Sequence, residues 1–433
     1  MKYRTIKRQL ASILTLALLF TLVLPFGNQT EAAPVGINLE VKSAIMVEAS
    51  TGRVLYKMNE NEALPPASMT KMMTELLTLE AIKSGKISWD DKVTTSEYGH
   101  WMGTYGGSRV YLGLGEIRTV RELYEAMAIY SANDATVMLA EHISGTEENF
   151  VSLMNQKAAE LGMENSHFVT SSGFPASELG QYAPSVEGDN LMTAKDSAIL
   201  AREIITKHPE ALQISSIPRK FFRGEDSPQK VRMDNWNFML PSLVYGFEGV
   251  DGLKTGHTNA AKYCFTGTAE RNGMRIITVV MGAETEAKRF AETKKLMTHG
   301  FNNFKMQAIV NKDKEIEGFE TVEVKKGKEL EAVAVPERDL IVPVRIDDEK
   351  NYKPVVTTQE VIAPVEKGQS IGKVSVEYSG EDLNEYLRPV DKEQNMVPLV
   401  AKEEVEEAGW IRLFFRAIKS FVAGLFDSIT GMF

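Results

Sequence analysis

This chain has 433 residues, of which 43% are hydrophobic and 25% charged, so it has the composition of a globular protein and enough length for about two or three domains. Its formal net charge of −10 argues against a nucleic-acid-binding protein. The single cysteine, Cys264, excludes an intramolecular disulfide, and we interpret it as a buried apolar residue without a redox role.

The first 32 residues follow the plan of a secretory signal peptide. An apolar run from Leu10 to Phe26 comes after four basic residues, and Thr30-Glu31-Ala32 matches a small-x-small cleavage site. Cleavage after Ala32 would remove the segment 1–32, and an uncleaved N-terminal anchor is the alternative. The pattern predicts an exported protein.

A β-hairpin is predicted at the start of the remaining chain. Its strands are Val41–Val47 and Arg53–Lys57, on either side of a turn at Ser50-Thr51-Gly52. We expect this hairpin to pair with two late strands, Tyr263–Ala269 and Met274–Gly282, which are joined through the tight-turn pair Asn272-Gly273. The segment between them, 68–215, is mainly helical with loops at 102–117 and 170–190, and an amphipathic helix over 284–301 closes the domain.

The first chemical motif follows the pair Pro65-Pro66, which ends the preceding element because each proline ring restricts the backbone. Ser68 is then at a helix start, and Lys71 lies one turn later on the same face. A serine needs an adjacent base to be a nucleophile, and lysine is that base only if its pKa is lowered. The same spacing occurs at Ser227–Lys230 and Ser370–Lys373, so the alternative is a helix cap with a solvated lysine.

Two further motifs follow in a fixed order. Ser131-Ala132-Asn133 lies in a predicted turn between helices at Thr119–Tyr130 and Asp134–Ile143. Lys254-Thr255-Gly256 lies on or beside a strand. Ser-x-x-Lys, Ser-x-Asn and Lys-Thr-Gly are together the motif set of penicillin-binding proteins and class A β-lactamases. Of the three Ser-x-x-Lys pairs, only the one at Ser68 precedes the other motifs.

After Phe301 the pattern changes to short alternating runs separated by Lys-Gly and Pro-Glu-Arg-Asp turns. This predicts a small antiparallel β-domain over 312–395, which we interpret as a spacer or docking module. The acidic segment 396–408 is predicted to be a linker. The final segment, 409–431, forms an amphipathic helix with a narrow basic face, which includes Arg412, Arg416 and Lys419, and a broad aromatic face. It is typical of a helix lying in a membrane interface, and a core helix of the β-domain is the alternative.

These motifs, the export signal and the C-terminal helix together resemble the low-molecular-mass penicillin-binding proteins that are serine D-alanyl-D-alanine carboxypeptidases. The resemblance implies an α/β (α+β) catalytic domain of the penicillin-binding transpeptidase type over 37–301, with an antiparallel sheet and a helical subdomain. It also implies the small all-β domain behind it. The expected activity is removal of the terminal D-alanine from peptidoglycan pentapeptide stems, with covalent inhibition by β-lactams, no metal and no cofactor.

The motif residues then have distinct expected roles. Ser68 attacks the carbonyl of the penultimate D-alanine and Lys71 accepts its proton. By resemblance, Ser131 relays the proton and Asn133 binds the substrate amide.

The third motif and its neighbour complete this resemblance. Lys254 lowers the pKa of Lys71, Lys254 and Thr255 bind the terminal carboxylate, and Gly256 is a further substrate-binding residue. The backbone N–H groups of Ser68 and His257 hold the oxyanion.

Other functions have weaker support in the sequence. Gly368-Gln369-Ser370-Ile371-Gly372 matches a nucleophile elbow, but it precedes a strand and no histidine follows it. No His-Glu-x-x-His is present, which argues against a zinc peptidase. A β-lactamase would need a Glu-x-x-Leu-Asn, and a penicillin sensor would need a spanning helix. The nearest alternative is a D,D-endopeptidase that cuts peptidoglycan cross-links. The expected location is the outer face of the bacterial cytoplasmic membrane, peripherally bound.

Overall fold

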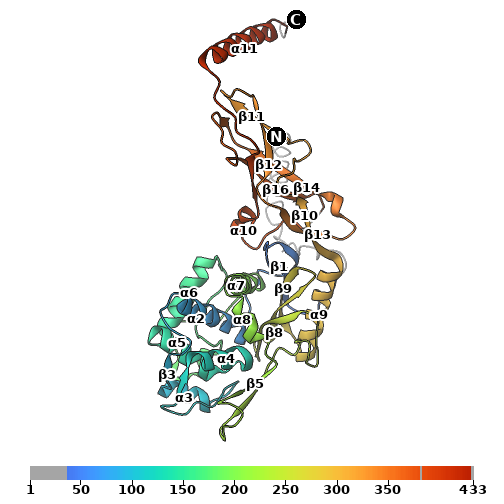
Figure 1. Ribbon diagram of the computed structural model, residues 1–433. Coiled ribbons are helices and arrows are strands. Elements are labelled where there is room, and N and C mark those ends of the chain that lie inside the picture. The colour runs from blue at the N-terminus through green and yellow to red at the C-terminus, as the bar shows by residue number, and fades with distance from the viewer. Residues whose placement is uncertain (1–36, 381–382, 431–433) are drawn as a thin grey trace, which may run out of the picture. The chain divides into compact units, whose positions relative to one another are not determined.

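The structure is a computed structural model that describes residues 37–380 and 383–430 (Figure 1). The predicted signal peptide, 1–32, lies outside the described residues. The description below therefore begins at Ile37.

A five-stranded antiparallel sheet forms the centre of the first domain. Its order is β2-β1-β9-β8-β7, and its strands are β1 Ser43–Glu48, β2 Val54–Met58, β7 Val250–Thr258, β8 Lys262–Arg271 and β9 Met274–Ala283. The N-terminal hairpin pairs with the late strands, as predicted, with Ile45 opposite Val279. Asn272 and Gly273 both have positive φ, as the tight turn between β8 and β9 requires.

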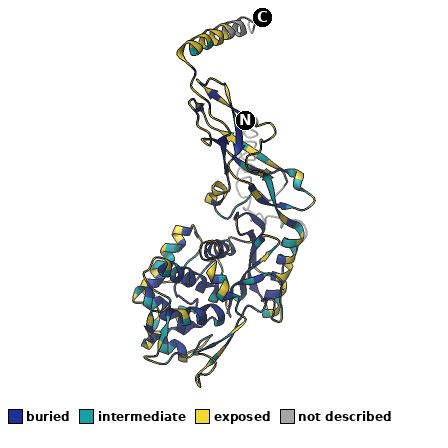
Figure 2. Cartoon of the chain, viewed as in Figure 1, coloured by how far each residue is buried: buried dark blue, intermediate teal, exposed yellow. Residues whose placement is uncertain are grey.

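Both faces of this sheet are covered, because alternate residues of a strand point to opposite sides. Ile45 and Val47 pack into one core with the helical subdomain, whereas Ala44 and Met46 pack into a second core with Phe290 of α9. Figure 2 shows the central strands as buried along their length. The sequence of β1 is therefore apolar at consecutive positions.

The helical subdomain lies between β2 and β7 in sequence and contains more elements than the sequence predicted. Its helices are α2 Lys71–Lys83, α3 Glu97–Thr104, α4 Val120–Tyr130, α5 Asn133–Ser144, α6 Glu147–Leu161, α7 Ala194–Lys207 and α8 Glu210–Ser215. Two small two-stranded sheets, β3 Lys92–Thr94 with β4 Ile117–Thr119 and β5 Arg219–Phe222 with β6 Val231–Asp234, were not predicted. The helix α9 Glu286–Asn303 packs on β8 and β9.

The second domain is all β, apart from short helices. β10 Phe304–Val310 pairs with β13 Leu340–Arg345, and a six-stranded sheet has the order β14-β16-β17-β12-β11-β15. Its strands are β11 Thr321–Lys325, β12 Glu331–Pro336, β14 Tyr352–Thr358, β15 Val361–Ile362, β16 Ser370–Tyr378 and β17 Val397–Ala401. The predicted fold class, an α+β catalytic domain followed by a small β-domain, is confirmed.

The prediction that 396–408 is a linker is wrong for the first half of this segment, which contains the strand β17 Val397–Ala401. β17 lies inside the six-stranded sheet, between β16 and β12, and Val405 forms a further bridge with Val365. Val397 and Leu399 are buried. These alternating apolar residues, just before the acidic run, explain why the segment is a strand of the sheet and not a linker. The β-domain also starts earlier than residue 312, because β10 is one of its strands.

The segment that includes α10 Pro389–Gln394 contacts the turn between β1 and β2. The fully buried Asp391 accepts a 2.8 Å hydrogen bond from Arg202 of α7, whose guanidinium also donates to the carbonyls of Ala49 and Ser50. The N–H of Val54 donates to the backbone carbonyl oxygen of Glu385 at 2.9 Å. Because a buried carboxylate needs such a cation to compensate its lost hydration, these contacts stabilise the turn.

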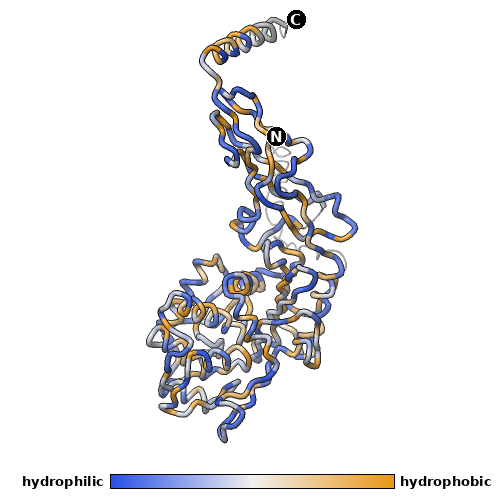
Figure 3. The backbone as a smooth tube through the Cα atoms, viewed as in Figure 1, coloured by the Kyte–Doolittle hydropathy of each residue, from blue (hydrophilic) through white to orange (hydrophobic). Residues whose placement is uncertain are grey.

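The chain ends in the helix α11 Trp410–Thr430. Trp410, Phe414, Phe415 and Phe421 are exposed, and Figure 3 shows hydrophobic and hydrophilic residues alternating along this helix. Arg416 donates to the carbonyl oxygens of Gly327 and Lys328 in the β-domain. Among the described residues, no helix combines the length and the apolar character that crossing a bilayer requires.

Candidate active site

Ser68 lies in a single 3-10 turn, Ala67–Thr70, that directly precedes α2. The sequence predicted that Ser68 lies at a helix start, and the α-helix itself begins at Lys71. The side-chain Nζ of Lys71 lies 2.9 Å from the Oγ of Ser68 and 2.8 Å from the carbonyl oxygen of Ser172. The two side chains are therefore in direct contact, as the Ser-x-x-Lys spacing predicted.

Lys71 is almost completely buried, with 1% of its surface exposed. Burial lowers the pKa of Lys71 well below its usual value, and the neighbouring cation Lys254 lowers it further, while Asp134 and Glu147 oppose this shift. A neutral amine beside a serine hydroxyl can accept its proton. This is the arrangement that an activated serine requires.

The Ser-x-Asn motif forms the sharp turn between α4 and α5. Ser131 caps α4 with a left-handed φ of 61°, and Asn133 begins α5. The Oγ of Ser131 is buried and has no hydrogen-bond partner among the described residues. The N–H of Asn133 donates to the carbonyl of Ser108 at 2.7 Å, so this turn is attached to the loop beside it.

The third motif lies on a strand, as predicted, and this strand, β7, is at the edge of the sheet. Lys254 is buried, and burial lowers its pKa to about 7, with Arg289 lowering it further and Glu75 opposing. A Cβ atom on Gly256 would lie 2.4 Å from the carbonyl oxygen of Pro66, so only glycine lets β7 approach the turn that carries Ser68. The fold thus brings two sequence-distant motifs into backbone contact.

One cleft of about 900 Å³ joins the three motifs. Its lining includes Ser68, Ser131, Asn133, Thr255, Gly256 and His257. Lys71 and Lys254 are buried beside the lining residues. The two other Ser-x-x-Lys pairs lie elsewhere, since Ser227 is in the β5–β6 hairpin and Ser370 is in β16 of the β-domain.

Three buried acids near the motifs were not singled out from the sequence. Glu75 of α2 accepts a 2.6 Å hydrogen bond from Tyr124, and burial raises its pKa to about 7. Glu147 of α6 accepts hydrogen bonds from the N–H and the hydroxyl of Ser171, next to the carbonyl that Lys71 contacts. Asp134, adjacent to Asn133, is the third. They occupy positions in ordinary helical patterns, so no local signal distinguishes them from surface acids.

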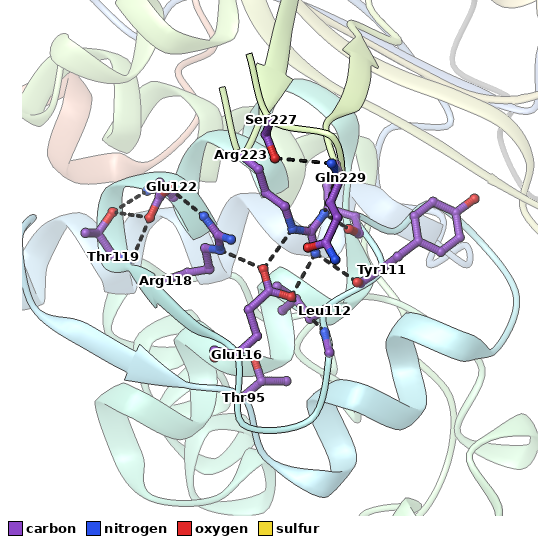
Figure 4. Close-up of polar contacts among 12 residues, drawn as sticks. Thr95, Tyr111, Leu112, Glu116, Arg118, Thr119, Glu122, Arg223, Ser227 and Gln229 are labelled. Carbon is purple, nitrogen blue, oxygen red and sulfur yellow. Dashed lines mark hydrogen bonds and ion pairs between the residues drawn. The ribbon is translucent and has the colours of Figure 1, made fainter. Parts of the chain in front are cut away.

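The loop 105–116, between α3 and β4, lines the cleft and is held by hydrogen bonds with Asp134 and Arg223. Asp134 accepts hydrogen bonds at 3.1 Å from the N–H groups of Val110 and Leu112. Arg223 donates to the carbonyls of Val110 and Tyr111 at 2.9 Å and forms a two-pronged ion pair with Glu116, as Figure 4 shows. This loop is therefore a fixed part of the site.

Comparison with known families and proteins agrees with this geometry. Residues 28–285 match the family model described as D-alanyl-D-alanine carboxypeptidase, and residues 304–407 match the C-terminal domain of penicillin-binding protein 5. The D-alanyl-D-alanine carboxypeptidase DacF of Bacillus subtilis is 35% identical over 95% of this chain and 98% of its own length. DacC of Escherichia coli is 31% identical, with coverages of 97% and 96%.

Solved structures give the same result. A peptidoglycan synthesis regulatory factor (PBP3) from Streptococcus pneumoniae superposes with a TM-score of 0.74 at 31% identity, covering 86% of this chain and 100% of that chain. Penicillin-binding protein 5 from Haemophilus influenzae has a TM-score of 0.70 at 30% identity, with the same coverages. With a family model matched across most of the first domain and relatives matched across nearly the whole length, the chain belongs to the D-alanyl-D-alanine carboxypeptidase family of penicillin-binding proteins.

Proposed function

We propose that this protein removes the terminal D-alanine from peptidoglycan pentapeptide stems through an acyl-enzyme on Ser68. The observation that carries the proposal is the 2.9 Å contact between Ser68 and the buried Lys71, in a cleft shared with the other two motifs. A serine beside a lysine whose pKa is lowered has a base that can accept its proton as it attacks an amide carbonyl.

In the first step, the Oγ of Ser68 bonds to the carbonyl carbon of the penultimate D-alanine while its proton passes to Lys71. The C–N bond to the last D-alanine then breaks, and the leaving amine takes a proton relayed by Lys71 and Ser131. Water hydrolyses the resulting ester and restores Ser68. The N–H groups of Ser68 and His257 stabilise the oxyanion in both steps.

The remaining cleft residues position the substrate. Asn133 holds the amide of the acyl portion, and Lys254, Thr255 and Gly256 hold the terminal carboxylate. A β-lactam enters the same site with its ring carbonyl at the position of the scissile bond. Because the amine it releases stays tethered to the acyl group, the penicilloyl enzyme persists.

We also propose that the protein is exported by its N-terminal segment and held peripherally on the outer face of the cytoplasmic membrane by α11. The exposed aromatic residues of α11 support this proposal, because burying them in the interface removes apolar surface from water. The basic residues of the same helix would attract anionic headgroups.

The experiment that tests the activity separates it from its nearest alternative, a D,D-endopeptidase. Purified protein is incubated with a stem pentapeptide and, separately, with a cross-linked dimer. Rapid release of free D-alanine from the pentapeptide supports the carboxypeptidase. Faster conversion of the dimer to monomers, with little free D-alanine, would replace it with the endopeptidase.

A further inference from the structure

Four aromatic side chains form a connected group that begins in the cleft. Phe174 lines the cleft. The centroid of its ring lies 6.1 Å from that of Tyr105, Tyr105 stacks on Trp101 at 4.6 Å, and the ring of Trp101 lies 5.4 Å from that of Tyr182. We call these four residues the aromatic cluster. It leads from the cleft to the surface, since Tyr105 is 42% exposed.

The inner end of the aromatic cluster lies beside two parts of the active site. Phe174 directly follows Gly173, where a Cβ atom would lie 2.0 Å from the carbonyl oxygen of Ala67, in the turn that carries the nucleophile. A Cβ atom on Gly107 would lie 3.5 Å from the ring of Phe174 and 2.6 Å from the side-chain amide nitrogen of Asn133. The aromatic cluster therefore starts next to Asn133, the residue proposed above to hold the amide of the acyl portion.

Buried residues support the aromatic cluster. Tyr182 stacks on the buried Tyr98, with ring centroids 4.6 Å apart, and the hydroxyl of Tyr98 donates a 2.5 Å hydrogen bond to the buried Glu147. Trp101, Phe174 and Tyr182 all pack against a small core that includes Tyr98 and Leu179. The rings are therefore held in place before a ligand binds, which reduces the entropy that binding would cost.

The chemistry of this surface suits a carbohydrate. A pyranose ring carries C–H groups on its faces and hydroxyl groups at its edge, so its C–H groups can pack on the negative face of an aromatic ring. Glu178 and Asp189 also line the cleft and are exposed, and neither carboxylate has a hydrogen bond or ion pair with any residue that the structure describes. These carboxylates can accept hydrogen bonds from sugar hydroxyls.

The ring-to-ring distances fit the length of the proposed substrate. Three residues lie between the penultimate D-alanine of a pentapeptide stem and the glycan that carries the stem. An extended residue spans about 3.3–3.6 Å, so these three residues span roughly 10 Å. The steps from Phe174 to Tyr105 and from Tyr105 to Trp101, of 6.1 and 4.6 Å, cover a comparable distance. A stem whose scissile bond is at Ser68 can therefore bring its sugar to the outer rings.

We infer that Tyr105 and Trp101 bind the glycan of the substrate by stacking on a sugar ring, so that the protein prefers stems attached to glycan over free stem peptides. This inference rests on the proposed carboxypeptidase activity. It adds a binding surface for a part of the substrate that the three catalytic motifs do not contact. The aromatic cluster is continuous with the cleft through Phe174, so one substrate molecule can occupy both.

The test compares two substrates that differ only in the sugar. The kcat/KM of D-alanine release is measured with a free pentapeptide and with the same pentapeptide on its glycan disaccharide. The proteins are the parent, Tyr105→Ala, Tyr105→Phe and Tyr111→Ala. Tyr111 is the matched control, because it also lines the cleft and is 56% exposed, but among the described residues its ring has no contact with the aromatic cluster.

We expect the parent to have the higher kcat/KM with the disaccharide-pentapeptide, and Tyr105→Ala to lower the ratio of the two kcat/KM values about fivefold. Tyr105→Phe, which keeps the ring, and Tyr111→Ala should keep the ratio of the parent. A parent ratio near one, or equal losses for both substrates in Tyr105→Ala, would overturn the inference. If Tyr105→Ala does not fold, Tyr105→Leu replaces it, and a parent ratio in folded Tyr105→Leu contradicts the inference.

A binding measurement separates this inference from the proposed function. The affinities of the same two ligands for Ser68→Ala protein, with and without Tyr105→Ala, are measured by calorimetry, which needs no turnover. A parent that releases D-alanine from neither substrate would refute the proposed function. The inference would still be supported if the disaccharide-pentapeptide binds more tightly than the free peptide and Tyr105→Ala removes the difference. Equal affinities of the two ligands would overturn it.

Discussion

At the scale of single residues, two buried lysines distinguish the candidate site. Lys71 contacts the nucleophile, and the pKa values of Lys71 and Lys254 are both lowered, chiefly because burial disfavours an ammonium group. Each lysine is therefore closer to neutrality than a surface lysine. We interpret Lys71 as the base, whose pKa is lowered chiefly by burial, and Lys254 as a neighbouring group that lowers it further when charged.

Replacing Lys71 tests this interpretation. Lys71→Arg keeps a positive charge but supplies no neutral base, because a guanidinium does not deprotonate in proteins. We expect the rate of penicillin acylation to fall about a hundredfold or more, as for loss of a general base. Lys83→Arg, at an exposed position at the end of the same helix, is the control. A rate near that of the parent would mean that Lys71 is only structural.

Replacing Glu147 gives a test in which the direction of the pKa shift of Lys71 is predicted. Glu147 is one of two buried acids that raise the pKa of Lys71, the other being Asp134, against the lowering by burial and Lys254. Glu147→Gln keeps an acceptor for Ser171 but removes the charge, so the pKa of Lys71 should fall further. The acid limb of the acylation rate should then move to lower pH. Glu148→Gln, at the exposed next position, should leave the limb in place; a shift to higher pH in Glu147→Gln would contradict this assignment.

At the scale of elements, the loop that forms the cleft wall depends on a few charged contacts. Glu116 bonds Arg223 and Arg118 and accepts from the N–H of Gly113, and these contacts lower its pKa to about 2 although burial opposes them. The loop carries no regular structure of its own between α3 and β4. Its position is therefore set by tertiary contacts.

The pH dependence of stability follows from this lowered pKa. A carboxylate whose folded-state pKa lies below its unfolded value stabilises the fold above the unfolded value, here 4.5, and loses that contribution as the pH falls toward 2. We expect Glu116→Gln to lower the free energy of unfolding by about 1–2 kcal/mol at pH 7, allowing for partial exposure. The difference from the parent should shrink between pH 4.5 and 2. Urea unfolding at several pH values measures this difference in the free energy of unfolding, with Glu164→Gln, at an exposed position, as the control. A difference that does not change with pH would contradict the prediction.

The helix α11 is a separate element with its own prediction. Deleting the residues after Gly409 should abolish binding to anionic liposomes and leave the release of D-alanine from small peptides nearly unchanged, because the three motifs precede residue 260. Salt should weaken but not abolish binding of the full-length protein. Sedimentation with liposomes measures the binding and its dependence on salt, and the rate of D-alanine release is measured separately. A truncated protein that still sediments would place the anchor elsewhere, and one that misfolds would make α11 part of the β-domain core.

The elements that sequence patterns predicted well are those whose signals are local. The hairpin β1–β2, the Asn272-Gly273 turn and the position of Lys254 on a strand all follow from turn residues and alternation. β17 was missed because its short apolar run is directly followed by acidic residues, and pairing with β16 and β12 is a long-range property. Glu147 and Arg223 were missed for the same reason, since only the fold brings them to the site.

At the scale of the whole molecule, the candidate active site is assembled from residues that are far apart in sequence. Ser68, Ser131 and Thr255 come from a turn before α2, the junction of α4 and α5, and an edge strand, and they meet in one cleft. The close approach at Gly256 shows that the sheet and the helical subdomain must pack at backbone distance for this to occur. The active site is thus a product of the complete first domain.

The most direct test of the central claim is to identify the residue that carries the acyl group. The protein is labelled with benzylpenicillin, digested and mapped by mass spectrometry, with Ser68→Ala as the control. We predict a penicilloyl group on the peptide containing Ser68, and no adduct on folded Ser68→Ala. An adduct on Ser227 or Ser370, or labelling that persists in Ser68→Ala, would contradict the account.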